Sequence, residues 1–240
     1  MSFMNKFFDQ HITVQWILAL LMLLMLFSIF ILWMKLLSDH LIALPLIILL
    51  PTLVQFFSAP MAKLVGIHTY LSPMLFVNNA TNKKYEIHNG TPFDYLLVMR
   101  KTRRGIRFRK QMLSYFLGGL LGIVERIEAT ELPESVIIQG NSYFFSAKTA
   151  SKLGFDLSET SIAVRINLLV NYFDLTWMYS LSKGRISFPK INEVKTAEIT
   201  GSCLVMNKHK LIRLNSFLNK SDPDRSGYAD DIYDGHLESQ

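Results

Sequence analysis

The chain has 240 residues, half of them hydrophobic, a net charge of +6 and a single cysteine, Cys203. One cysteine excludes an internal disulfide and a cysteine-based metal cluster, and it agrees with a reducing compartment. Residues 1–57 are neutral and residues 219–240 carry −4, which leaves +10 on residues 58–218. A basic domain of this kind favours an anionic partner such as acidic lipid, nucleic acid or an acidic protein, although ordinary solvated surface charge also explains it.

Two long apolar runs, residues 16–34 and 41–57, lie near the N-terminus, and neither contains a charged side chain. A helix needs about 20 apolar residues to cross the ~30 Å core of a bilayer, where every backbone polar group must be paired. We therefore predict a transmembrane helical hairpin over residues 16–59, with a tight turn at residues 35–40. A signal peptide is disfavoured, because its apolar region is shorter than the first run and because a second run follows at once.

Trp16 and Trp33 bracket the first run and lie 17 residues apart, roughly 25 Å along a helix. Because tryptophan prefers the headgroup level, both are predicted membrane-interface anchors. Pro45 and Pro51 each remove a backbone donor and predict kinks in the second run, which serve either packing or a gate. The loop between the runs has one basic residue, Lys35, and many more follow the second run, so both termini are predicted to be cytoplasmic.

The remaining sequence divides into a leader at 1–15, a basic cytoplasmic domain at 60–218 and an acidic tail at 219–240. The tail contains Pro, Gly and many Asp residues and is predicted to be disordered. Mixed strand and helix signals in the basic domain predict an α+β fold behind the transmembrane hairpin.

Two short strands are expected at residues 74–77 and 85–88, on either side of a polar turn. A helix should then begin at Thr91, whose side chain is a suitable N-cap, with Pro92 and Asp94 in its first turn, and end near Arg104. The apolar run from residue 112 to 124 predicts a buried helix. It is too short for a straightforward membrane span, although a re-entrant segment is an alternative.

Residues 136–139 and 142–145 flank a Gly-Asn pair and predict a β-hairpin. A short helix capped by Ser146 should follow and end at Gly154. An amphipathic helix is expected over residues 160–181, and a last helix from Asn207. The first of these two helices places Asn167, Asn171 and Asp174 on one face, which we interpret as part of core packing.

The densest charge feature runs from Arg100 to Lys110, where seven of eleven residues are basic. Arginine binds phosphate bidentately, and the interleaved Phe108 is suited to stack on a nucleic-acid base. The same side chains would also suit anionic lipid headgroups, and ordinary surface charge that fixes membrane topology is a third interpretation. The candidate phosphate- or lipid-contacting residues are Arg100, Lys101, Arg103, Arg104, Arg107, Arg109 and Lys110.

Catalytic and metal-binding patterns are weak. Tyr228-Ala-Asp230-Asp231 has the spacing of the metal-binding turn of reverse transcriptases, but it lies in a polar tail instead of a buried hairpin. The six histidines show no paired metal spacing, and no nucleophile elbow, phosphate-binding loop or dinucleotide fingerprint occurs. Glutamates at 125, 128, 131 and 134 are interpreted as a charged helix end. We therefore expect neither a metal site nor a cofactor, and no enzymatic activity.

Two N-terminal apolar spans, residues 16–34 and 41–57, followed by a basic cytoplasmic domain resemble the two-transmembrane effectors of bacterial anti-phage systems of the retron type. This resemblance is one of architecture. It implies a protein of the inner membrane whose activation in abortive infection disturbs the bilayer and stops growth. The implied partners are the lipid bilayer and a reverse transcriptase with its RNA–DNA product, while a homo-oligomer is left open. A membrane-tethered adaptor for nucleic acid, anionic lipid or an acidic protein is the alternative function.

Overall fold

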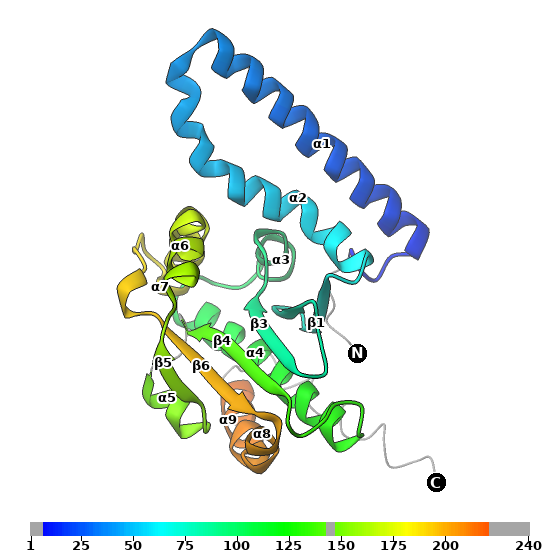
Figure 1. The fold of residues 1–240 in the computed structure, drawn as a ribbon, viewed down its shortest axis with the longest axis vertical. Helices are drawn as coiled ribbons and strands as arrows, with labels where there is room; N and C mark the ends of the chain where they lie inside the picture. The colour runs from blue at the N-terminus through cyan, green and yellow to red at the C-terminus, as the bar shows by residue number, and fades with distance from the viewer. Residues whose placement is uncertain (1–6, 143–146, 221–240) are drawn as a thin grey trace.

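The computed structural model describes residues 7–142 and 147–220. A pair of long apolar helices rises from an α+β domain built on a six-stranded mixed sheet (Figure 1). The predicted α+β class of the domain is therefore confirmed, and so is the pair of apolar helices at the N-terminus. The acidic tail and its Tyr228–Asp231 segment lie outside the described residues.

The first arm of the hairpin is α1 (Ile12–Asp39), a helix of 28 residues. The second arm consists of a 3₁₀ segment, η1 (Leu41–Leu49), and helix α2 (Leu50–Leu64). At 1.5 Å per α-helical residue and 2.0 Å per 3₁₀ residue, both arms are about 40 Å long. The stretches Ile12–Asp39 and Ala43–Leu64 are each long and apolar enough to cross a membrane.

The predicted boundaries of the hairpin are partly wrong. The polar residues from Lys35 to Asp39 continue α1, so that His40 alone separates the arms, in an extended conformation. Pro45 has no N–H to donate within η1, which fits the 3₁₀ geometry of that segment. Pro60 lies inside α2, and the helix continues to Leu64, five residues beyond the predicted end of the hairpin.

The sheet has the strand order β1-β2-β3-β4-β6-β5, in which only the β3–β4 pair is parallel. The predicted strands at 74–77 and 85–88 are confirmed as β2 and β3, an antiparallel pair. Strand β1 was missed because all five of its residues are half-buried and lack an alternating pattern. The strands are β1 (His68–Ser72), β2 (Leu75–Asn78), β3 (Lys84–Asn89), β4 (Ile137–Ser142), β5 (Asp156–Glu159) and β6 (Lys195–Thr200).

The β-hairpin predicted around Gly140-Asn141 is wrong. Both residues lie inside the single strand β4, where they pair with Ala197 and Thr196 of β6. Gly140 is needed there because a Cβ atom would lie 2.6 Å from the Ile87 side chain on β3. The glycine therefore permits close packing of strands instead of making a turn. Residues 143–146, including the predicted cap Ser146, lie outside the described part of the chain.

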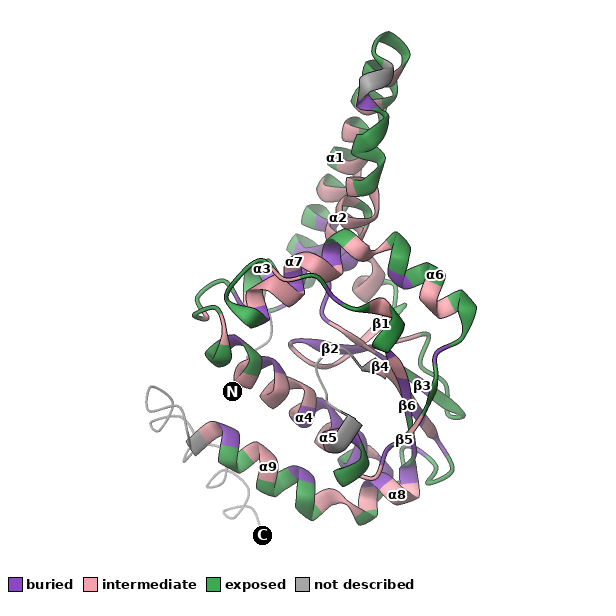
Figure 2. Ribbon diagram, turned by 90° about the vertical axis from the view of Figure 1, so that its left-hand side faces the viewer, coloured by how far each residue is buried: buried purple, intermediate pink, exposed green. Residues whose placement is uncertain are grey.

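Helix α4 forms the centre of the domain and packs on one face of the sheet (Figure 2). Its residues Leu117, Leu120 and Ile123 have no exposed surface, which confirms the predicted buried helix. The close approach depends on Gly119, where a Cβ atom would lie 2.6 Å from Leu75 on β2. The domain helices are α3 (Pro92–Val98), α4 (Ile106–Glu128), α5 (Ala147–Lys152), α6 (Ile162–Val170), α7 (Tyr172–Lys183), η2 (Ile191–Glu193), α8 (Gly201–Met206) and α9 (Lys208–Lys220).

Two predicted helices are shorter than expected. The helix capped by Thr91 ends at Val98, and Gly105, with a φ of +88°, begins α4 instead of ending α3. The helix expected over residues 160–181 is interrupted at Asn171, which separates α6 from α7. A final helix close to Asn207 is confirmed as α9, and Gly154 has the expected positive φ.

Candidate functional site

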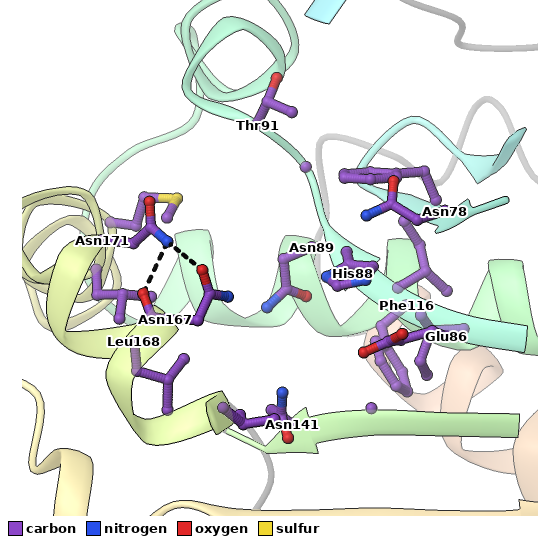
Figure 3. A pocket seen from close by; sticks show the side chains of 18 of the residues that line it. Asn78, Glu86, His88, Asn89, Thr91, Phe116, Asn141, Asn167, Leu168 and Asn171 are labelled. Atoms are coloured by element: carbon purple, nitrogen blue, oxygen red, sulfur yellow. Dashed lines mark hydrogen bonds between the residues drawn. The ribbon is translucent and has the colours of Figure 1, made fainter. Parts of the chain in front are cut away.

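A cavity of about 570 Å³ lies between the sheet and the α6–α7 helix pair (Figure 3), and Gln55 of α2 also lines it. Asn89 ends β3 and Asn141 lies one residue before the end of β4, so the parallel pairing brings both amides to one edge of the sheet. In open sheets, ligands bind beyond the carboxyl ends of parallel strands. The volume falls within the range of about 300–1,000 Å³ that is common for ligand pockets.

Carboxamide side chains are the main polar feature of this cavity. They come from β2, β3, β4, α6, the α6–α7 junction and α2, so distant parts of the chain meet here. A carboxamide donates and accepts hydrogen bonds without carrying a charge, which suits a neutral ligand with both kinds of group. The amides are Asn78, Asn89, Asn141, Asn167, Asn171 and Gln55.

Aromatic rings line the neighbouring wall. The ring of Phe76 lies between His68 and His88, with centroid distances of 4.4 Å and 5.5 Å, and it is nearly parallel to His88. Burial, with a smaller contribution from the charge of His88, lowers the pKa of His68 to about 4. Burial also lowers the pKa of His88. Both imidazoles are therefore neutral at pH 7.

The electrostatics of the lining disfavour an anionic ligand. None of the described residues that line the cavity is Lys or Arg. Two acidic residues, Glu86 and Asp174, do line it. Asp174 is 2% exposed. Burial raises its pKa, and the hydroxyl of Thr52 on α2 partly offsets this effect. None of the described lining residues supplies a cation that could replace the hydration of a phosphate group.

Asn171 connects the cavity to the helical hairpin. Its side-chain nitrogen donates to the backbone oxygen and the amide oxygen of Asn167, at 2.8 Å and 3.0 Å. Its side-chain oxygen accepts a hydrogen bond from Nε2 of Gln55 on α2, at 2.5 Å. Asp174, three residues after Asn171, lies near Thr52, which is on α2 like Gln55. Gln55 of α2 is thus part of the cavity wall.

The basic cluster predicted from the sequence lies elsewhere. Its first four members are in the α3–α4 connection and the others are in the first turns of α4; none lines the cavity. All are exposed except the half-buried Lys110. Phe108 cannot stack on a base as predicted, because it is 2% exposed and packs 5.8 Å from Tyr95 in the core.

The other predicted residues have structural surroundings. Trp33 donates a hydrogen bond from its indole nitrogen to the backbone oxygen of Ala43, 3.2 Å away, and so joins the two arms of the hairpin. Trp16, near the base of α1, is 37% exposed. Glu128 forms a surface ion pair with Lys208 at 2.7 Å. Within residues 7–142 and 147–220, no group of three His, Cys, Asp or Glu side chains could hold a metal ion.

No protein-family model, curated protein or solved structure matches this chain. Its function must therefore be inferred from the geometry of the molecule itself. Asn167, Asn171 and Asp174 share one face as predicted, but that face, which we interpreted as core packing, lines the cavity. The cavity was missed because its other amides lie far away in the chain.

Proposed function

We propose that this protein is a membrane-anchored sensor in which the cavity binds a small neutral ligand and the hairpin transmits its presence to the bilayer. One observation carries this proposal: Gln55 of the hairpin lines the cavity and bonds Asn171 within it. A ligand that binds the Asn171 amide must compete with that bond or add to it. Its binding energy would therefore depend on the position of α2, which is the condition for coupling.

Several features support a membrane-crossing hairpin. From Ile12 to Met34 the first arm has no charged residue and measures about 34 Å, slightly more than the bilayer core. Most residues of α1 are exposed, and Gln15 and Ala19 are its only buried residues. An apolar helix with this much exposed surface is stable in lipid and costly in water. The proposed topology places both termini in the cytoplasm.

The proposed ligand is an unphosphorylated nucleobase or nucleoside. Carboxamides form paired hydrogen bonds with base edges, as Asn and Gln do with adenine. The half-buried neutral imidazoles of His68 and His88 line the cavity and offer rings for stacking. The absence of Lys and Arg among the described lining residues argues against a phosphorylated form.

Thermal unfolding of the full chain in detergent tests this ligand class, with adenosine, guanosine, cytidine, uridine and their monophosphates as probes. A nucleoside at 100 times its Kd stabilises the folded state by about 2.7 kcal/mol. We expect at least one nucleoside to raise the melting temperature and its monophosphate to raise it less. Asn89→Leu should abolish the shift, whereas Gln111→Leu, an amide replacement on α4 outside the cavity, should retain it. No shift with any probe contradicts the ligand class.

Coupling is tested separately by Gln55→Leu. Because the lost hydrogen bond is worth about 1 kcal/mol, the variant should change hairpin-dependent activity without abolishing ligand binding. Membrane potential, followed by a fluorescent dye in bacteria that express each variant, is the measurement. Depolarisation identical in wild type, Gln55→Leu and Gln111→Leu would refute the proposed transmission. Depolarisation by the wild type is also what an effector of retron-type antiviral defence requires, a setting that stays a prediction.

The basic cluster supports a second candidate function, that of a membrane-tethered adaptor for nucleic acid or another anionic partner. Six of its seven members are exposed on the α3–α4 connection and the start of α4. Binding through phosphates falls steeply with salt. Replacement of Arg103, Arg104, Arg107 and Arg109 by serine should therefore remove salt-sensitive binding of single-stranded DNA by the full chain. Equal binding by wild type and variant would exclude this function.

A further inference from the structure

Helix α6 exposes apolar side chains in a continuous stripe. Ile162, Ile166, Leu169, Val170 and Phe173 are spaced so that they share one helical face, which continues into the start of α7. Ile162 is 78% exposed and Leu169 is 65% exposed. A row of five large apolar residues in water is unfavourable and marks an interaction surface.

A second apolar surface follows α7. Ile186 is 82% exposed and Phe188 is 66% exposed, and they directly follow the exposed basic residues Lys183 and Arg185. Apolar side chains that enter lipid beside long basic side chains that reach the headgroups are typical of interfacial segments. In Figure 2, α3, α6 and α7 lie at the end of the domain from which the hairpin rises.

The hairpin fixes the depth of α6. Gln55 bonds Asn171, the residue that directly follows α6. Gln55 lies about 14 Å along α2 from the lower end of the helix at Leu64. The distance from Gln55 to the tip of the hairpin at Leu41 is about 26 Å, which is less than the ~30 Å thickness of a bilayer core. A hairpin that spans this core therefore holds the C-terminal end of α6 at the boundary of the cytoplasmic leaflet.

We propose that the exposed stripe of α6 and the 183–188 segment are immersed in the headgroup–acyl boundary of the cytoplasmic leaflet. This inference rests on the proposed membrane crossing and goes beyond it, because the domain then lies partly in the bilayer. Continuity with the apolar hairpin and the flanking Lys183 and Arg185 favour anionic lipid over a second copy of the chain. The cavity wall formed by α6 and α7 would then lie directly above the membrane surface.

Site-specific fluorescence tests this placement. The full chain carrying Cys203→Ser and one added cysteine is labelled with bimane and reconstituted in phosphatidylcholine–phosphatidylglycerol vesicles. Leu169→Cys reports on the stripe, and Phe217→Cys on α9 is the matched control, because both residues are 65% exposed. Lipids with a nitroxide near the headgroup should quench the Leu169 label several-fold more than the control, and aqueous iodide should do the reverse.

A third position separates the two proposals. Leu24→Cys, within α1, should be quenched by lipids with a nitroxide deep in the acyl chain. If the Leu24 label is quenched but the Leu169 label is as accessible to iodide as the control, the immersion of α6 is refuted and the span survives. If neither label is quenched by lipid, both proposals fail. Pyrene excimers at Leu169 without lipid quenching would show that a second copy covers the stripe, which also overturns the inference.

Discussion

Replacement of Asp94 tests the connection between the sheet and α3. This carboxylate has no exposed surface. One of its oxygens accepts hydrogen bonds from the hydroxyl of Tyr70 at 2.8 Å, and from the backbone nitrogen and hydroxyl of Thr91 at 2.8 Å and 2.9 Å. Burial, together with the adjacent Asp94 charge and hydrogen bond, raises the pKa of Tyr70 far above its usual value.

Asp94→Ala should be among the most destabilising single substitutions in the domain. Hydrogen bonds to a charged group contribute about 1.5–3 kcal/mol each, and the variant leaves the Tyr70 and Thr91 donors buried without an acceptor. Because such losses are not additive, we expect a total of about 3–5 kcal/mol. For a chain of this size, each kcal/mol lowers the melting temperature by about 2–4 °C, which predicts a decrease of about 6–20 °C.

Thermal unfolding of the full chain in detergent, followed by near-UV circular dichroism, measures this effect. Asp156→Ala on the edge strand β5 is the control, because Asp156 is exposed and the same carboxylate is lost. Tyr70→Phe should cost about 1 kcal/mol in the wild-type background and almost nothing beside Asp94→Ala, since the bond is then already absent. Equal melting temperatures for Asp94→Ala and Asp156→Ala would refute the reasoning.

Two further predictions concern packing and pH. The added Cβ atom of Gly118→Ala meets no atom within 4 Å, whereas that of Gly119→Ala lies 2.6 Å from Leu75. Because both substitutions gain equally in helix propensity, denaturant unfolding should show Gly119→Ala to be less stable than Gly118→Ala by about 1–3 kcal/mol. Equal stabilities of the two variants would contradict the packing of α4 on β2. The folded-state pKa of His68 is about 4 and its ordinary value is 6.5. The unfolded chain therefore binds more protons between these values, so the melting temperature should fall from pH 6.5 to pH 4. His68→Gln should flatten this decrease, and an unchanged pH profile in the variant would exclude His68 as its source.

Local signals accounted for much of the fold. The two apolar runs predicted the paired helices, because their length and lack of charge are properties of the segments themselves. Thr91 and Asp94 lie three residues apart, and their capping box forms as that spacing predicts. The prediction failed where a distant partner decides the conformation. Gly140-Asn141 has the composition of a turn, yet two neighbouring strands hold it extended.

The sequence by itself determined that two uncharged apolar helical segments precede a basic α+β domain, since hydropathy and helix capping act over a few residues. Only the tertiary structure decided that Asn89 and Asn141 meet Gln55 and Asn171 around one cavity. An asparagine has the same polarity in a loop, a strand end or a pocket, so its type does not reveal which others it will face. The parallel pairing of β3 with β4 and the hydrogen bond between Gln55 of α2 and Asn171 supply that information, because they join residues that are 53 and 116 positions apart in the chain.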